Sequence, residues 1–213
     1  MGRGEKVILE NCVVEDTLVF ASGENAGGMI GSASQVSLLS CFQLGASGNA
    51  SSQVVTSNSG GAGGLIGVAL DVLKVSKSGV EGGRMETREK EGCGGGIVGK
   101  SLTGELFFSQ TYVTERCSVF STNSGGFGGC LEGEGSLNME HCFSLANLQE
   151  QEGSGKAIGV FGMSGNHSIS SCKFTQTNFS IFFLSFLDSL SFFSSKKASL
   201  QVTQVKKKEK KEG

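Results

Sequence analysis

The sequence contains no proline, no tryptophan and a single tyrosine, Tyr112, among its 213 residues. Aspartate is also scarce, and its three occurrences are Asp16, Asp71 and Asp188. These aspartates, like the two histidines His141 and His167, occupy unrelated positions in the repeats described below. Enzymes that cleave polysaccharides on a repeat fold need carboxylate pairs or calcium sites built from adjacent repeats. We therefore predict a non-enzymatic protein without catalytic residues, metal ligands or cofactors.

Neither sign of charge is in large excess, because the formal net charge at pH 7 is −2. This balance argues against nucleic acid as the main partner. Residues 196–213 nevertheless hold seven Lys and two Glu, which is +5, so the remainder carries −7. The tail could bind an anionic surface, but a solvated, disordered end is the favoured interpretation. The first residues have none of the features of a secretory signal peptide.

No Cys-x-x-Cys pair occurs among the seven cysteines, which argues against a zinc site. Two pairs, Cys12 with Cys41 and Cys142 with Cys172, could lie on neighbouring repeats within disulfide distance. Reduced cysteines that pack as small apolar residues are the favoured alternative. An odd number leaves at least one thiol without a partner in its own chain.

Glycine is abundant, with 34 residues, and much of it recurs in one phrase. GGMIG at residues 27–31 returns as GGLIG at 63–67 and GGIVG at 95–99, then in weaker form as GGCL at 128–131 and IGVF at 158–161. Counting 13 residues from the second glycine of the first copy reaches Cys41, and the same count in the last two copies reaches Cys142 and Cys172. In the two middle copies it reaches Lys77 and Ser109, so the predicted cysteine ladder is interrupted there.

Apolar residues alternate before these cysteines, as in Val36 and Leu38 or Leu137 and Met139. A period of two is typical of half-buried strands. About three short strands per repeat, with glycine at corners that need positive φ, indicate stacked coils in which equivalent strands pair. The sequence therefore predicts an all-β parallel β-helix (solenoid) of about five irregular coils over residues 7–176.

The phrase GGLIG, followed by a short strand and cysteine, resembles the GLUG motif of large bacterial and protist surface proteins. FSTNSGGFGG at residues 120–129 is similar to the FxxN and GGA[ILV] repeats of polymorphic outer membrane proteins. The resemblance covers residues 7–174 in five imperfect copies. It implies a right-handed β-helix that is secreted or displayed on a surface for adhesion or as a stalk, and it implies no catalytic residues. The sequence departs from those families in showing no N-terminal export signal and no obvious anchoring domain. We therefore expect it to be a piece of a longer surface protein, or a chain that needs a neighbour at its N-terminal end.

Residues 177–195 differ from the repeats in composition, because they are rich in Phe and Ser and lack the glycine phrase. Apolar residues follow helical spacing there, at Phe179, Phe182, Phe183, Phe186, Leu187, Leu190 and Phe193. We predict an amphipathic helix that caps the last coil, with a further degenerate coil or a surface membrane helix as alternatives. A membrane span is not supported, because the run covers about 15 residues and includes Asp188.

Residues 94–101, GGGIVGKS, match the nucleotide-binding pattern GxxxxGK[ST]. Lys100 and Ser101 would then contact phosphates and Mg²⁺, and Gly94 would open the phosphate loop. Such a loop follows an apolar strand and opens a helix. A charged run precedes this match, and Gly104 follows it where a helix should continue. We therefore interpret the match as a by-product of the glycine repeat.

The expected function is structural, adhesive or display, at the cell surface or outside the cell. Residues 45–52 and 79–93 are expected to project as contact loops, because insertions in solenoids leave the rod. Expected partners are surface glycans or host and neighbouring proteins, and an uncapped first coil could associate end to end. The alternative is a carbohydrate-binding or carbohydrate-cleaving β-helix, which an exposed aromatic ladder would favour.

Overall fold

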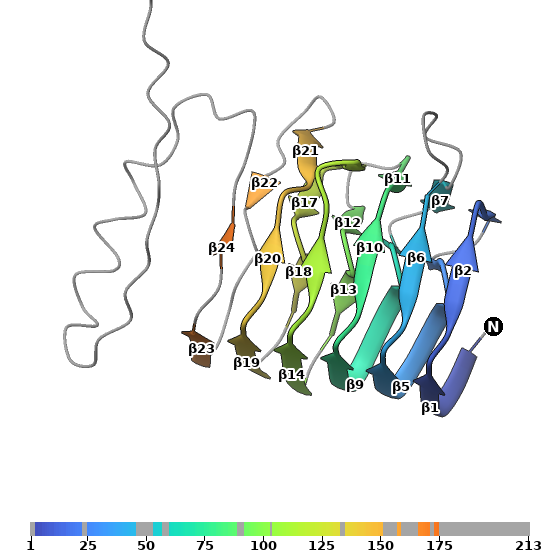
Figure 1. Ribbon diagram of the computed structural model, residues 1–213. Coiled ribbons are helices and arrows are strands. Elements are labelled where there is room, and N and C mark those ends of the chain that lie inside the picture. The colour runs from blue at the N-terminus through green and yellow to red at the C-terminus, as the bar shows by residue number, and fades with distance from the viewer. Residues whose placement is uncertain are drawn as a thin grey trace, which may run out of the picture.

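The computed structural model describes residues 3–22, 25–45, 53–56, 60–88, 92–102, 104–132, 135–150, 157–158, 166–170 and 173–174. Over these residues the chain is all-β and contains no helix, and every strand pairing is parallel. Figure 1 shows the coils stacked side by side in chain order, from blue to orange. The predicted right-handed parallel β-helix is confirmed. Residues 177–195 and 196–213, where a capping helix and a basic tail are expected, lie outside the described residues.

The largest sheet, called the long sheet here, has eight strands, six of which follow one another from coil to coil. In spatial order these strands are β1 (Arg3–Glu10), β5 (Ile30–Leu39), β9 (Ile66–Ser76), β14 (Gly104–Ser109), β19 (Gly135–Glu140) and β23 (Asn166–Ser170). The first halves of β5 and β9 continue in later coils as the separate strands β13 (Val98–Ser101) and β18 (Gly128–Leu131).

Three further sheets complete the wall. The side sheet contains β2 (Val13–Glu15), β6 (Phe42–Leu44), β10 (Gly79–Glu81), β15 (Tyr112–Val113), β20 (Phe143–Ser144) and β24 (Lys173–Phe174). The upper sheet contains β3 (Leu18–Ala21), β7 (Gln53–Thr56), β11 (Gly83–Thr87), β16 (Cys117–Ser121) and β21 (Asn147–Glu150). The inner sheet contains β4 (Ala26–Gly27), β8 (Gly61–Gly63), β12 (Cys93–Gly95), β17 (Asn123–Gly125) and β22 (Ala157–Ile158).

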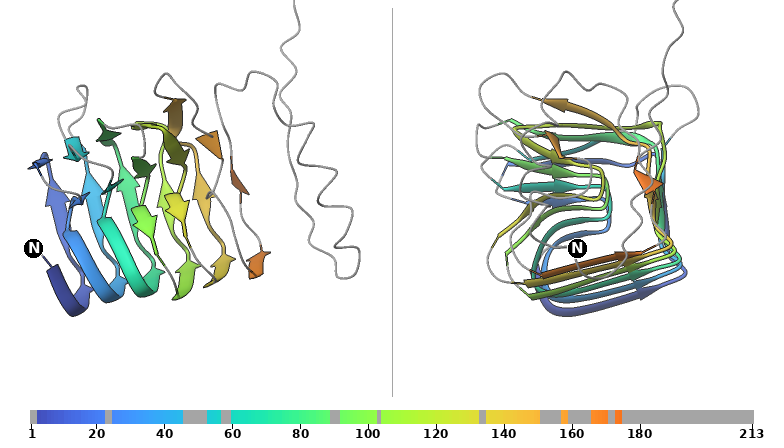
Figure 2. Two further views of the ribbon diagram at one scale, coloured as in Figure 1. Left: turned by 180° about the vertical axis from the view of Figure 1, so that it is seen from behind. Right: turned by 90° about the vertical axis from the view of Figure 1, so that its left-hand side faces the viewer.

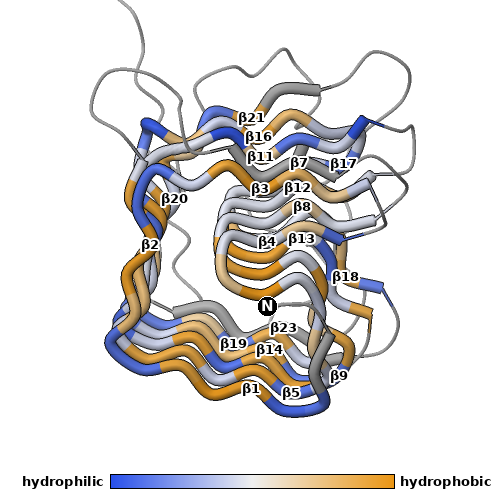
Figure 3. Tube along the Cα trace, turned by 90° about the vertical axis from the view of Figure 1, so that its right-hand side faces the viewer, coloured by the Kyte–Doolittle hydropathy of each residue, from blue (hydrophilic) through white to orange (hydrophobic). Residues whose placement is uncertain are grey.

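Each coil runs through the long, side, upper and inner sheets in that order. Seen end-on, the inner strand enters the middle of the coil and turns back into the next long strand (Figure 2, right; Figure 3). We call this feature the inner hairpin; the four that the structure describes in full join β4 to β5, β8 to β9, β12 to β13 and β17 to β18. The inner hairpin enters the cross-section, so the core lies between this hairpin and the surrounding sheets.

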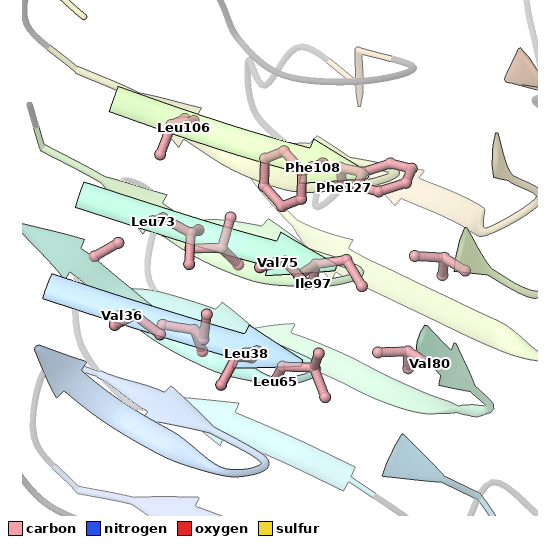
Figure 4. Packing of buried hydrophobic residues seen from close by; sticks show 14 of the residues in the cluster. Val36, Leu38, Leu65, Leu73, Val75, Val80, Ile97, Leu106, Phe108 and Phe127 are labelled. Atoms are coloured by element: carbon pink, nitrogen blue, oxygen red, sulfur yellow. The ribbon is translucent and has the colours of Figure 1, made fainter. Parts of the chain in front are cut away.

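Alternating side chains of the long sheet form the floor of this core. One column is Val36, Leu73, Leu106 and Leu137, and the next is Leu38, Val75, Phe108 and Met139. All eight side chains are at most 2% exposed. The tips of the inner hairpins close the core from the opposite side with Leu65, Ile97 and Phe127, as Figure 4 shows. The period-two pattern read from the sequence therefore points its apolar residues inward as predicted.

The glycine phrase forms the inner hairpin rather than an outer corner. A Cβ added to Gly63 would lie 1.9 Å from the Ile66 carbonyl oxygen and 2.6 Å from the Gly99 nitrogen. A Cβ on Gly99 would lie 2.4 Å from the Ala62 nitrogen. The two arms of the hairpin therefore pass each other with backbone against backbone, and only glycine leaves room for this.

The corner between the long and side sheets is formed by non-glycine residues with positive φ. Its residues are Asn11, Ser40, Lys77, Gln110 and His141, and all have φ between 50° and 55°. The prediction that glycine supplies positive φ at the corners is wrong here. Non-glycine residues adopt this conformation at a cost, and each coil repeats it because hydrogen bonds to the next coil hold it, as from the Lys77 nitrogen to the Ser109 oxygen (3.0 Å).

The strand register corrects the sequence alignment of the repeats. Met29, Leu65, Ile97 and Phe127 are equivalent, because the nitrogen of each of the first three donates to the oxygen of the next. The fourth copy of the phrase is therefore GGFGG at residues 125–129, and the alignment on GGCL is three residues out of register. The predicted loop at 79–93 is also corrected, because residues 79–81 and 83–87 are the paired strands β10 and β11.

The register also restores the ladder that seemed interrupted. Pairing in the side sheet makes Cys12, Cys41, Ser78, Thr111 and Cys142 equivalent, since the residue after each lies in one column. The distance from the second glycine grows from 13 residues (Gly28 to Cys41) to 14 (Gly64 to Ser78), 15 (Gly96 to Thr111) and 16 (Gly126 to Cys142). The added residues fall between the two halves of the long strand, where Ala33 to Val36 spans three residues and Leu131 to Leu137 spans six.

Candidate functional surfaces

A disulfide joins Cys93 and Cys130, whose Cα atoms are 5.5 Å apart. Cys93 begins the inner strand of one hairpin, and Cys130 lies on the returning arm of the next. The close approach of Gly129 to the Cys93 backbone brings the two cysteines together, because a Cβ on Gly129 would lie 2.6 Å from the Cys93 carbonyl carbon. The bridge thus ties two consecutive inner hairpins. The prediction of reduced cysteines is wrong for this pair.

Four other described cysteines are not in disulfides: Cys12, Cys41, Cys117 and Cys142. The sequence-predicted pair Cys12 and Cys41 does lie in one column, but it is not bridged. Burial raises the pKa of Cys41, and it raises the pKa of Cys117 to about 11. Thiols with raised pKa values are poor nucleophiles at neutral pH. None of these four cysteines forms a disulfide, as predicted, and Cys41, Cys117 and Cys142 are buried; Cys172 lies outside the described residues.

The residues of the nucleotide-binding match adopt the repeat conformation. The nitrogens of Gly96, Ile97 and Val98 donate to carbonyl oxygens of the next coil at 2.9–3.3 Å, so these amides are not directed at a common anion. Lys100 pairs with Glu132 (2.9 Å between Nζ and Oε1), and the Ser101 side chain is fully buried. Strand β13 follows the turn where a phosphate loop would open a helix. These residues close an inner hairpin and present no phosphate cradle.

An aromatic group lies on the outer face of the side sheet. Phe42, Gly79, Tyr112 and Phe143 occupy one column. The rings of Tyr112 and Phe143 are stacked, with centroids 5.4 Å apart and planes at 12°, and Phe42 lies 6.2 Å from Tyr112 on its other side. The Tyr112 hydroxyl donates a hydrogen bond to the Glu81 carboxylate. Sequence reasoning missed this group, because the fixed count of 13 residues reached Lys77 and Ser109, so Tyr112 was not aligned with Phe42 and Phe143.

The geometry of these rings limits what they can bind. Sugar rings stack on the exposed faces of aromatic side chains. Tyr112 has Phe143 against one face, and it covers Gly79 with the other, where an added Cβ would lie 2.5 Å from the ring. Both faces of the Tyr112 ring are therefore covered, so this ring is not available for stacking with a sugar.

The outer faces of the other sheets carry isolated polar and aromatic contacts. Cations lie over rings in three places: Lys74 over Phe107, Arg84 over Phe120 and Arg88 over Phe20. In each pair the cation and the ring belong to different coils, so the contact helps to hold those coils together on the outer surface. Arg84 also contacts Glu86 at 2.9 Å.

The sequence-predicted acidic and histidine positions do not converge. Asp16 and Asp71 are exposed and lie on different sides of the coil, and Asp188 is outside the described residues. His141 is an exposed corner residue whose Nε2 lies 3.3 Å from the neighbouring Glu140. Within the described ranges, no three His, Cys, Asp or Glu side chains are grouped as metal ligands. Residues 46–52 and 89–91, within the two expected contact loops, are not described.

A search of the part of the chain that the structure describes finds no helix with the length and apolar character of a membrane span. Comparison with protein-family models, curated proteins and solved structures gave no match for this chain.

Proposed function

We propose that this protein is a secreted or surface-displayed scaffold, in which a rigid β-helix presents its outer columns to other macromolecules in a structural or adhesive role. The observation that carries the proposal is the Cys93–Cys130 disulfide between consecutive inner hairpins. Structural disulfides persist in oxidising surroundings outside the cytosol and are rare where thiol reductants are abundant.

The position of the bridge supports a structural role for it. Cys93 is 1% exposed and Cys130 is half-buried, so the bridge is shielded from solvent on the Cys93 side. The bridge closes a loop of 37 residues that contains a complete coil. A bridge of that span restrains the unfolded chain and keeps two coils in register, which a displayed rod needs when it meets shear or proteases.

The outer surface suits many weak contacts better than one reaction. Polar, charged and apolar side chains are mixed on the outer faces of the sheets, and the described part contains no group of three His, Cys, Asp or Glu side chains placed to hold a metal ion. Rigid strands hold these side chains at a fixed repeat, so a partner that spans several coils gains contacts additively without ordering the scaffold. This is how a stalk or adhesin would act.

The proposal is tested in the organism that makes the protein. Intact cells and culture medium are alkylated before lysis, labelled with an impermeant biotin reagent, and the chain is analysed by peptide mass spectrometry. We expect biotinylated or secreted protein in which the Cys93 and Cys130 peptides are joined. Cys41 and Cys142 serve as internal controls, because they should be recovered as thiols after denaturation.

Two results would count against the proposal. One is protein that is labelled only after lysis. The other is alkylated Cys93 and Cys130 in freshly quenched cells, which would place the chain in a reducing compartment. Binding of polysaccharides to the purified protein, abolished by Tyr112→Ala, would instead favour the carbohydrate-binding alternative.

A further inference from the structure

The first coil carries most of the large apolar side chains that the described surface exposes. Ile8, Val13, Leu18 and Phe20 are 55–65% exposed, and all belong to β1, β2 and β3. Inward residues of the same coil, such as Val7 and Leu9, are only partly buried. The long edge strand β1 pairs with β5 on one side, and no described strand covers its other side. An open strand with apolar side chains is a template for another strand.

The hydrogen-bonding phase of this edge is determined by its contacts with the second coil. The Asn11 nitrogen donates to the Leu39 oxygen at 2.9 Å, so it points toward β5. Backbone groups of successive residues alternate sides along a strand. The N–H and C=O groups of Lys6, Ile8 and Glu10 therefore point to the open edge. The same three residues have exposed side chains, while Val7 and Leu9 point toward the core.

We propose that this edge binds β1 of a second copy of the chain, in an antiparallel, two-fold symmetric pair centred on Ile8. In that register Ile8 faces Ile8, and Lys6 of each copy faces Glu10 of the other. The three residues whose backbone groups are free then oppose one another, as a hydrogen-bonded antiparallel pair requires. Val7 faces Leu9 on the inner side, so apolar contacts continue the core across the junction.

Charge selects this register over its neighbours. A pair centred on Lys6 places two lysines opposite each other, and one centred on Glu10 places two glutamates opposite each other. A pair centred on Val7 leaves Lys6 opposite Ile8 and Glu10 opposite Gly4. Opposite charges across a strand pair stabilise it and like charges weaken it. A two-fold axis doubles every such contact, because each residue pair occurs twice. This inference does not depend on the proposed function.

The first test is a charge exchange measured by sedimentation velocity on the full chain over a wide concentration series. We expect the unmodified chain to form a dimer at high concentration. Glu10→Lys and Lys6→Glu should each raise the dimer dissociation constant about tenfold or more, because each variant creates two repulsive pairs. The double variant Lys6→Glu/Glu10→Lys should restore it. Glu140→Lys is the matched control, since Glu140 lies in the same outer column as Glu10, four coils away.

The second test examines the register directly and does not depend on affinity. Facing residues of a hydrogen-bonded antiparallel pair have Cα atoms about 5.5 Å apart, within disulfide range. In a Cys12→Ser background, Ile8→Cys should oxidise to a covalent dimer, and Val13→Cys should not. The parent Cys12→Ser protein must remain uncrosslinked. Circular dichroism establishes that each variant keeps the β-rich fold.

Three outcomes would overturn the proposal. An unmodified chain that stays monomeric at all concentrations would mean that another segment or no partner covers the edge. A dimer indifferent to both single charge reversals would use another face. Failure of Ile8→Cys to crosslink in a protein that dimerises would exclude this register.

Discussion

The ring of Tyr112 occupies the space that a side chain on Gly79 would fill, one coil earlier in the side sheet. A Cβ on Gly79 would lie 2.5 Å from the Tyr112 Cζ atom. The same ring stacks on Phe143 and donates its hydroxyl hydrogen to Glu81. Burial, and then the hydrogen bond to the Glu81 carboxylate and its negative charge, raise the pKa of Tyr112 to about 12.

The titration of Tyr112 can be followed without interference, because the chain has no other tyrosine and no tryptophan. We expect the tyrosinate absorbance of the native protein to rise with a midpoint near pKa 12, against about 10 in denaturant. Glu81→Gln should lower the midpoint by removing the neighbouring charge. Gly79→Ala should lower it as well, because the added methyl group displaces the ring from its half-buried position over Gly79.

The same shift predicts a pH dependence of stability. A tyrosine whose folded pKa exceeds its unfolded pKa stabilises the fold fully below pH 10, and this contribution is lost as pH rises through about 12. In chemical denaturation, the unmodified chain should therefore lose stability relative to Tyr112→Phe as the pH rises from 10 toward 12. A native midpoint near 10, or parallel pH profiles for the two proteins, would contradict the half-buried, hydrogen-bonded tyrosine.

The sequence predicts the coil architecture well because two chemical requirements recur in it. Backbone contact in the inner hairpin demands glycine, and the floor of the core demands apolar residues two apart, as in Leu38 and Val36. The alignment of the repeats by sequence fails because it assumes a constant distance from the glycine phrase to the corner, whereas this distance grows from coil to coil. Each coil adds a residue between the halves of the long strand, so the position of Cys41 is taken by Ser78 and Thr111, which a count of 13 misses. GGFGG also offers glycine at several offsets, which hides the register.

Two other features needed three-dimensional information. Cys93 and Cys130 occupy different positions of the repeat, and their contact crosses from one hairpin arm to another, so a search for in-register pairs passes over them. The segment Gly83–Thr87 resembles a charged insertion in the sequence. The alternation of its outward and inward side chains is the sequence signal that could have identified it as a strand. Met85 and Thr87 are buried while Arg84 and Glu86 point outward, as in any half-buried strand.

Removal of the disulfide should destabilise the fold substantially. A closed loop of 37 residues corresponds to about 4 kcal/mol of unfolded-state entropy at 25 °C, and measured losses are typically about 2–4 kcal/mol. We expect Cys93→Ser/Cys130→Ser to lower the free energy of unfolding within that range in a denaturant titration. Reductant should affect the unmodified chain and leave the double variant unchanged. Equal stability of the two proteins would show that the bridge does not form in solution.

Alanine in the wall of the inner hairpin should be poorly tolerated. A Cβ on Gly63 would come within 1.9 Å of a carbonyl oxygen that is itself part of the backbone, so no side-chain rotation relieves the contact. We expect Gly63→Ala and Gly99→Ala each to cost about 3 kcal/mol or more, through separation of the two hairpin arms. Ser32→Ala, in the same type of hairpin but with a half-buried side chain, should change stability by less than about 1 kcal/mol. Thermal unfolding monitored by circular dichroism distinguishes the two classes, and a mild effect at Gly63 would refute the backbone-to-backbone contact.

Glycine should instead be beneficial at the corner between the long and side sheets. Lys77 has a φ of 50°, where a side chain costs about 1–2 kcal/mol and glycine does not. The greater freedom of glycine in the unfolded chain offsets part of this gain, so Lys77→Gly should raise the free energy of unfolding by about 1 kcal/mol or less. Ser76→Gly is the matched control, because Ser76 is the last residue of β9 and has no positive φ; there glycine should lower stability by about 0.5–1 kcal/mol. The opposite signs of two adjacent, chemically similar changes are a strict test, since a general effect of glycine on the chain would move both in one direction.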